Sequence, residues 1–320
     1  MKQFFLIVFG GALAVSFGVG VAYGGAVGWR YLEPKLASIS SSIALPAASV
    51  VAHDGTFISG MKRAIKYTAS EEEAFIESAV LSLPAAADKR VSASAYLVKN
   101  LTLGDVPTEH NPDQLFPIAS LTKLITAVIV RQQFNVEERI VMTQPALATY
   151  GNSAYFKVGE TLKVSDLMYP LLMVSSNDAA EAFARAHGRK QFIDDMNDWV
   201  QSIGAYRTYF ADPSGLSPLN VSTANDIALI LDWIRLNDPE IIKITSLKSK
   251  TVRSHTWINP THYLSWSYYI GGKNGYTSEA NRTSAGLFKL GKNKNIYAVV
   301  VLGSDNRDAD VLKLMAKVRD

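Results

Sequence analysis

The sequence predicts a mixed α/β (α+β) fold, because strand patterns lie on both sides of a run of helix patterns. Residues 92–100, SASAYLVKN, and residues 295–303, NIYAVVVLG, have the apolar and β-branched content of buried strands. Between them lie several helix patterns, the most apolar of which begins at Ser120. Strands on both sides of a group of helices are typical of α+β and mixed α/β domains.

The first element of the chain is an uncharged segment, residues 4–29. About 20 apolar residues cross a bilayer as a helix, whereas the apolar core of a cleaved signal peptide has about 7–15. The length therefore predicts a transmembrane anchor over residues 1–29, with Lys2 before the apolar segment and Arg30 after it. We expect a single-pass protein of the cell membrane whose remaining part is extracytoplasmic.

Residues 30–90 are predicted to form a stalk and linker, because Ser, Ala and Pro residues follow the anchor. One short helix is expected over residues 70–83, with Ser70 as its N-cap and Pro84 after its end. The remaining residues, 91–320, are predicted to form the functional domain.

The first half of this domain begins with the strand over residues 92–100. The apolar helix from Ser120 follows, and its almost unbroken apolar sequence indicates that it is buried on all sides. Residues 163–188 are expected to form two helices, with breaks near Pro170 and at residues 174–177.

The second half of the domain contains a helix over residues 223–236, for which Thr223 and Asp226 are a predicted capping pair. Strands over residues 282–290 and 295–303 are expected to form a hairpin. A helix over residues 308–318 is predicted to close the domain.

Composition and motif content exclude several kinds of function. The 320 residues include no cysteine, which excludes disulfides, thiolate catalysis and cysteine-based zinc sites. The net charge of +3 is spread along the chain, so no nucleic-acid partner is expected. His255 and His262 lie in a polar stretch without paired carboxylates or an HExxH pattern, so neither a metal ion nor another cofactor is expected.

Ser120 and Lys123 have a spacing that is suited to catalysis. Residues three apart on a helix share a face, with Cβ atoms about 5–6 Å apart. A lysine can remove the serine proton only when it is neutral, so its pKa must fall below the usual value of about 10.4. The apolar run after Lys123 predicts burial, which lowers that pKa, and the helix N-terminus adds to the effect.

The Ser-x-x-Lys pattern alone is weak, because a helix cap followed by a lysine that reaches solvent also produces it. A second copy, Ser59 to Lys62, contains a glycine and precedes no buried helix, so we assign it no catalysis. Two further triplets support Ser120. Ser175-Ser176-Asn177 lies at a break between helices, and Lys273-Asn274-Gly275 enters a strand.

Serine enzymes that recognise D-alanyl-D-alanine or β-lactams use Ser-x-x-Lys, Ser-x-Asn and Lys-Thr/Ser-Gly in this order. Their chemistry needs a second hydroxyl to carry a proton to the leaving amine and an amide to hold the substrate backbone. It also needs a second cation to lower the pKa of the base, and a glycine that lets the strand approach the substrate.

With these motifs, the chain resembles the low-molecular-mass penicillin-binding proteins, the serine D-alanyl-D-alanine carboxypeptidases, over about residues 91–320. The stretch YLVKNLTLGDVPTEHNPDQLFPIASLTKLITAVIV is similar to the family's strand, turn and nucleophile helix, and DPSGLSPLNVSTANDIALIL to its wall loop and following helix. The resemblance implies the penicillin-binding/β-lactamase-like transpeptidase fold, an antiparallel sheet flanked by helices plus a helical subdomain. It also implies peptidoglycan stem peptides as substrates and β-lactams as inhibitors.

The resemblance further implies a role for each motif residue. Ser120 would be the acylated nucleophile, Lys123 its general base and Ser175 the proton relay. The backbone N–H groups of Ser120 and Tyr276 would form the oxyanion hole. The residues implied to bind substrate are Asn177, which would hold its backbone, Lys273, which would supply charge, and Asn274, Gly275 and Tyr276.

Two positions depart from the family pattern. Asn274 stands where the family has threonine or serine, and Asn225 stands where many members have arginine; both positions would face the terminal carboxylate of the substrate. Arg282 is a candidate to compensate. A D,D-endopeptidase, which cuts a cross-link, would lose less from these changes than a carboxypeptidase.

Three interpretations therefore stay open: a carboxypeptidase, a D,D-endopeptidase, and a degenerate member that binds muropeptides without turning them over. A β-lactamase is disfavoured, because neither Glu181 nor Glu240 lies in a loop like that of the deacylating glutamate of class A enzymes.

Overall fold

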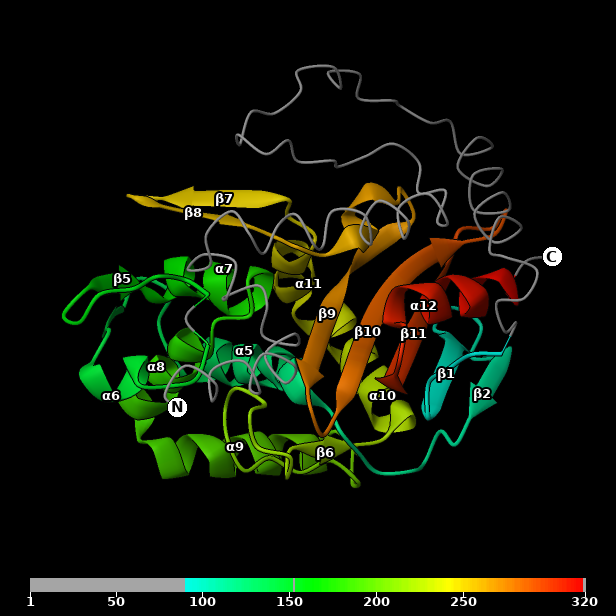
Figure 1. Ribbon diagram of the computed structural model, residues 1–320, viewed down its shortest axis with the longest axis horizontal. Helices are drawn as coiled ribbons and strands as arrows, with labels where there is room; N and C mark the ends of the chain where they lie inside the picture. Colours follow the sequence, from blue (N-terminus) through cyan, green and yellow to red (C-terminus); the bar gives the residue numbers. More distant parts are fainter. Residues whose placement is uncertain (1–89, 152, 319–320) are drawn as a thin grey trace, which may run out of the picture. The chain divides into compact units, whose positions relative to one another are not determined.

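The computed structural model describes residues 90–151 and 153–318 (Figure 1). The predicted anchor over residues 1–29 and the predicted helix over residues 70–83 lie outside these residues. The segment boundaries at residues 29 and 90 therefore stay predictions. Within the described part of the chain, no helix is both long enough and apolar enough to cross a membrane.

A five-stranded antiparallel sheet forms one side of the domain (Figure 1). Its strands, in spatial order, are β2 (Thr108–His110), β1 (Ala95–Asn100), β11 (Asn295–Ser304), β10 (Asn281–Leu290) and β9 (Tyr269–Thr277). The first and last long strands are neighbours, paired from Ala95 with Leu302 to Asn100 with Tyr297. The predicted strands at both ends of the domain and the β10–β11 hairpin are confirmed.

Helices and short two-stranded ladders complete the domain. The helical elements are η3 (Ala119–Leu121), α5 (Thr122–Gln133), α6 (Gln144–Leu147), α7 (Val164–Met173), α8 (Asn177–His187), α9 (Arg189–Ser202), α10 (Ala224–Asn237), α11 (Pro239–Thr245), η4 (His262–Ser265) and α12 (Arg307–Ala316). The short ladders pair β3 (Phe116–Pro117) with β6 (Val221–Ser222), β4 (Arg139–Val141) with β5 (Thr161–Lys163), and β7 (Ser249–Val252) with β8 (His255–Ile258).

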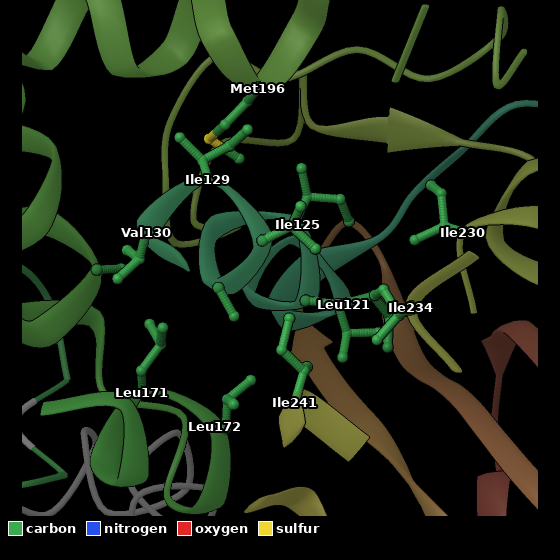
Figure 2. Close-up of a cluster of buried hydrophobic side chains, with 14 of the residues drawn as sticks. Leu121, Ile125, Ile129, Val130, Leu171, Leu172, Met196, Ile230, Ile234 and Ile241 are labelled. Atoms are coloured by element: carbon green, nitrogen blue, oxygen red, sulfur yellow. The ribbon is translucent and has the colours of Figure 1, made fainter. Parts of the chain in front are cut away.

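Helix α5 is the centre of the larger core. All residues from Thr122 to Val130 are buried, as the apolar sequence predicts. Figure 2 shows side chains of four other helices around those of α5 and η3, namely Leu171 and Leu172 of α7, Met196 of α9, Ile230 and Ile234 of α10 and Ile241 of α11. Full burial of one such side chain contributes about 1.5–3 kcal/mol, so this cluster fixes the start of α5 firmly in the fold.

The two faces of the sheet belong to different cores, because side chains alternate along each strand. Val300 and Leu302 of β11 face the larger core with α5 and α10. Val299 and Val301 face a smaller core that α12 covers. Strand β9 lies at the edge of the sheet and contacts η3, so one long edge of the sheet meets the start of α5.

A buried carboxylate joins the beginning of the domain to its last helix. Asp310 of α12 is fully buried and accepts hydrogen bonds from Ser92 N at 2.9 Å and Ser92 Oγ at 2.6 Å. It also accepts one from Ser304 Oγ at 2.7 Å. Because the carboxylate has several donors, its burial costs little.

The predicted break near Pro170 is wrong, because α7 continues through this residue to Met173. Pro170 lacks only the N–H that would reach the carbonyl four residues earlier, and its own carbonyl accepts from Ser176 N at 2.9 Å. It is also packed in the core. The break predicted at residues 174–177 is confirmed for residues 174–176, whereas Asn177 is the first residue of α8.

The capping prediction for α10 is half right. Thr223 is the N-cap, and its hydroxyl accepts from Asp226 N at 3.1 Å. The Asp226 carboxylate, however, accepts from Arg207 N and Thr208 Oγ1, at 2.9 and 2.8 Å. It therefore ties α10 to the preceding loop.

Candidate active site

The start of α5 carries a buried lysine with three close oxygen atoms. Lys123 Nζ lies 3.1 Å from Ser120 Oγ, 2.7 Å from Asn177 Oδ1 and 2.5 Å from the Ser214 carbonyl oxygen. The lysine is fully buried. The structure thus brings together three segments that are far apart in sequence around one amine.

This arrangement suits a neutral amine, which has two N–H groups and one lone pair. The Ser214 carbonyl and Asn177 Oδ1 can only accept hydrogen bonds, so they take the two N–H groups. The lone pair is left for the Ser120 hydroxyl, which can donate. In this state Lys123 is placed to remove the Ser120 proton.

Electrostatics favour that neutral state. Burial lowers the pKa of Lys123 well below its ordinary value, and the positive charge of Lys273 lowers it further. The Asp212 carboxylate acts in the opposite direction and raises the pKa of Lys123. The apolar sequence after Lys123 predicted the burial, but it contained no sign of Asp212.

A loop over residues 212–220 closes the other side of Lys123. Asp212 Oδ1 accepts from Ser214 N and Gly215 N, at 2.6 and 2.7 Å, and Oδ2 accepts from Ser217 N at 2.5 Å. Asn220 Nδ2 donates to Thr122 Oγ1 at 3.0 Å, which fastens the loop to α5. These contacts hold the Ser214 carbonyl against the amine.

Gly215 permits a close contact between this loop and the residue before the nucleophile. Its φ of +86° is in the left-handed region, and a Cβ there would lie 1.9 Å from the Ala119 carbonyl oxygen. Ala119 itself has a φ of +48°, an uncommon conformation for a residue with a side chain. The backbone on both sides of this contact is therefore locally constrained.

Asn177 has a defined amide orientation. Its Nδ2 donates to the Tyr150 carbonyl at 2.7 Å, so Oδ1 faces Lys123. Asn177 is the first residue of α8, after the N-cap Ser176, whose hydroxyl accepts from Ala179 N at 3.1 Å. The structure thus places Asn177 against Lys123 as well as beside the cavity.

Ser175 lines the cavity and has a constrained backbone. Its Oγ is buried and has no hydrogen-bond partner among the described residues, and its backbone is left-handed with a φ of +61°. Strained conformations of this kind cluster at functional sites. Since a buried hydroxyl without a partner is costly, this one is suited to a group on a bound substrate.

Lys273 of β9 is buried close to the site. Burial and the Arg307 guanidinium lower the pKa of Lys273 to about 7. Its Nζ donates to the carbonyl of the next residue, Asn274, at 2.8 Å. Asn274 pairs with Ser284 and Lys273 with Ala285, so the two side chains lie on opposite faces of the sheet.

Gly275 lets β9 approach the nucleophile. A Cβ there would lie 2.8 Å from Ser120 N and 2.6 Å from Thr283 Oγ1. The next residue, Tyr276, is 63% exposed and lines the cavity. The free long side of β9 and the N–H of Ser120 therefore lie close to each other, as an oxyanion site requires.

These groups surround a cavity of about 320 Å³. Of the predicted residues, Ser120, Ser175, Asn177 and Tyr276 line it, while Lys123 and Lys273 are buried nearby. Asn274 and Gly275 do not line it. Further lining residues carry no motif that would have indicated them in the sequence, namely Tyr150, Gly151, Ser153, Gly215, Leu216 and Thr277.

Asn225, expected near a substrate carboxylate, and Arg282, the candidate to compensate, both have other partners. Asn225 Nδ2 donates to Asp113 Oδ1 at 2.7 Å. Arg282 donates to the Asp305 carbonyl at 3.0 Å, and its guanidinium lies 5.6 Å from the centre of the Tyr276 ring. Among the described residues, none of those that line the cavity carries a charge.

Known proteins share the sequence pattern and the fold of this chain. The sequence model of the Peptidase_S11 family, described as D-alanyl-D-alanine carboxypeptidase, matches residues 82–306. A D-alanyl-D-alanine endopeptidase of Haemophilus influenzae is 32% identical over 166 residues, which are 51% of this chain and 56% of that protein. D-alanyl-D-alanine carboxypeptidase DacA of the same organism is 28% identical over 284 residues, 83% of this chain and 64% of that protein.

This chain thus matches less than two thirds of the length of these two relatives, 56% and 64%. Among solved structures, penicillin-binding protein D2 of Listeria monocytogenes in a cefotaxime-bound form has a similar fold, with a TM-score of 0.64 and 27% identity. That match covers 71% of this chain and 97% of the other.

Proposed function

Since the chain belongs to the Peptidase_S11 family of D-alanyl-D-alanine carboxypeptidases, we propose that it cleaves peptidoglycan stem peptides through an acyl-enzyme on Ser120. The family and the penicillin-binding-protein fold are those that the three motifs predict. The assignment of substrate and of residue roles is our proposal, and the placement of Lys123 against Ser120 is the observation that carries it.

The proposed reaction begins with neutral Lys123, which takes the Ser120 proton as Oγ attacks the carbonyl carbon of the penultimate D-alanine. The N–H groups of Ser120 and Tyr276 stabilise the resulting oxyanion. The peptide C–N bond then breaks, and the leaving amine receives a proton through Ser175. Water attacks the ester on Ser120 and releases the shortened peptide.

Covalent labelling by penicillin tests this proposal. We expect mass spectrometry of the protein, after incubation with penicillin, to show one adduct that maps to Ser120. Ser120→Ala should abolish the adduct. An adduct on Ser59, or no adduct at all, would refute the assignment of the nucleophile, and muropeptide binding without an adduct would support the non-catalytic interpretation.

A D,D-endopeptidase is the second candidate. It is supported by the uncharged lining of the cavity and by the contact of Asn225 with Asp113. A carboxypeptidase must bind a free terminal carboxylate, and hydrogen bonds to charged groups contribute about 1.5–3 kcal/mol. A cross-linked peptide presents a different group on the leaving side of the scissile bond, so we expect this cavity to disfavour it less.

Two substrates distinguish these activities. The protein should be given a pentapeptide, with release of D-alanine measured, and a cross-linked muropeptide dimer, with release of monomers measured. A dimer rate equal to or above the pentapeptide rate supports the endopeptidase. Asn274→Thr should raise kcat/KM for the pentapeptide by roughly ten-fold; an unchanged or lower value would show that the residue at position 274 does not limit binding of the carboxylate.

We also propose that residues 4–29 anchor the protein in the cell membrane, with the catalytic domain on the outer side. The uncharged length of this segment supports the proposal. The N-terminal sequence of the protein isolated from membranes provides the test. A chain that begins near residue 25–30 would show cleavage and contradict the anchor.

A further inference from the structure

We propose that Thr149 and Asp178 are positioning residues for the general base Lys123, and that they act through the Tyr150 carbonyl and the Asn177 side chain. This inference rests on the proposed function of Ser120 and Lys123. Neither residue belongs to the three motifs, and neither touches Ser120.

The proposal follows a continuous series of contacts. Thr149 Oγ1 donates to Asp178 Oδ1 at 2.6 Å. The next residue, Tyr150, accepts from Asn177 Nδ2 at 2.7 Å, and Asn177 Oδ1 accepts from Lys123 Nζ at 2.7 Å. Residues 149–150 and 177–178 are therefore joined twice, once through side chains and once through a backbone carbonyl.

The double connection makes the Tyr150 carbonyl a fixed acceptor. The position of a backbone carbonyl in a surface segment depends on what holds the segment in place. The Tyr150 side chain is 85% exposed, so this side chain cannot anchor the segment. The adjacent Thr149 side chain can, because it is bound to a carboxylate at the buried start of α8. Hydrogen bonds to a charged acceptor are shorter and stronger than those between neutral groups.

Burial of the Asp178 carboxylate costs free energy unless the carboxylate makes a stabilising contact of this kind. It is 1% exposed, and its Oδ2 has no partner among the described residues. Burial raises its pKa, while the hydrogen bond from Thr149 lowers it. The second residue of a helix is favourable for a carboxylate, but leaving one of its oxygen atoms unsatisfied is not. The contact with Thr149 is therefore its principal stabilising interaction with another side chain.

The orientation of Asn177 is the step through which these residues affect catalysis. If the Tyr150 carbonyl moves, Nδ2 loses its acceptor and the amide can rotate or flip. Lys123 would then face an N–H donor or lose one contact, and its lone pair would no longer be directed at Ser120. Misplacement of a catalytic group by about 1 Å can cost on the order of 10²-fold in rate.

A double-mutant cycle tests the proposal on the full chain. The second-order rate constant for acylation of Ser120 by penicillin should be measured for wild type, Thr149→Val, Asn177→Ala and the double variant. Each rate is normalised to the number of sites that are acylated at saturation, so unfolded protein does not count. We expect Thr149→Val to slow acylation by roughly ten-fold in the wild-type background and less than about two-fold in Asn177→Ala.

Two further variants separate positioning from folding. Thr149→Ser keeps the hydroxyl and should retain a rate near that of wild type. Thr102→Val removes a threonine hydroxyl away from the site, which accepts from Ile296 N at 3.0 Å, and should leave the acylation rate unchanged. If Thr149→Val does not fold because Asp178 loses its partner, the cycle is made with Thr149→Val/Asp178→Asn, which removes the unpaired charge.

The outcomes are distinct. Equal losses from Thr149→Val in both backgrounds would overturn the proposal, because Thr149 would then act independently of Asn177. A wild-type rate in Thr149→Val would overturn it as well. Absence of any adduct on wild-type Ser120 would instead overturn the proposed function itself.

Discussion

At the scale of single residues, the site depends on how one amine is surrounded. Sequence spacing was sufficient to find Ser120, Lys123, Ser175, Asn177 and Lys273, because their side chains define the motifs. It could not find the carbonyl groups of Ser214 and Tyr150, since any residue type carries the same backbone oxygen. These acceptors depend on loops whose conformation is set by tertiary contacts.

Loss of the general base is the first prediction. Lys123→Ala should slow acylation of Ser120 by about 10²–10⁴-fold, the usual contribution of such a base. Stopped-flow or quenched reaction with penicillin would measure this rate. A variant that reacts as fast as wild type would assign the proton transfer to another group.

The second prediction concerns the pH at which the base becomes neutral. Acylation should increase with pH as Lys123 loses its proton, with a midpoint well below the ordinary lysine pKa. Lys273→Met removes a positive charge that lowers the pKa of Lys123, so the midpoint should move to higher pH. The rate is measured across pH 5–10 for both proteins. A midpoint that moves down, or stays fixed, contradicts this coupling.

At the scale of elements, the helices and strands with many apolar residues close together in the sequence were the ones that could be predicted. The strands β1, β10 and β11 and the helices α5 and α12 have dense apolar patterns and were expected. Helix α9 was not expected, although Phe192, Met196, Trp199 and Val200 have the i, i+4, i+7, i+8 spacing of an amphipathic helix. The β7–β8 hairpin also lacks a strong turn signal, with Arg253-Ser254 between its strands.

The packing of the loop over residues 212–220 against η3 leads to a third prediction. Gly215→Ala should slow acylation by on the order of 10²-fold and lower stability, because its Cβ would displace the Ala119 carbonyl next to Ser120. Gly104→Ala is the matched control, since Gly104 has a similar φ of +88° and no atom within 4 Å of a Cβ.

The free energy of unfolding of the Gly104→Ala control should fall by only about 1–2 kcal/mol, the cost of a side chain on a left-handed backbone. Its acylation by penicillin should proceed at the wild-type rate. Denaturant unfolding and the acylation rate are measured for both variants. Equal acylation rates in the two variants would show that the Gly215 contact does not shape the site.

At the scale of the whole molecule, the family pattern predicted the arrangement of sheet and helices correctly. What it could not show is how the buried charges between these layers affect stability. Lys273 lies between the sheet and the helical part and is 7% exposed. Because its pKa is lowered in the folded protein, the free energy of unfolding decreases at any pH at which this lysine is protonated in the unfolded chain.

The fourth prediction follows from that cost. In the unfolded chain, Lys273 has a pKa near 10.5, whereas in the folded protein the pKa is about 7. Between these values the unfolded chain binds more protons, so the free energy of unfolding should rise with pH, by at most about 1.4 kcal/mol per unit for this group.

Urea unfolding at pH 7 and pH 9 measures this rise. Lys273→Met should show a smaller increase than wild type, and some increase should remain because Lys123 titrates in the same direction. An identical increase in both proteins would mean that Lys273 is not buried in its neutral form.

The hydrogen bonds between Ser92 and Asp310 affect how the domain would resist a pulling force. A chain held in the membrane and acylated by the cell wall at Ser120 would carry load between these two points. The load would first meet the hydrogen bonds to α12, from Lys313 Nζ to the Arg90 carbonyl and from Ser92 to Asp310, and must break them before it reaches β1. From there it would spread through the antiparallel ladders of β1, β11, β10 and β9 to the nucleophile. Tension on the tether would therefore act on the hydrogen-bonded strands of the sheet as well as on η3, which carries Ser120.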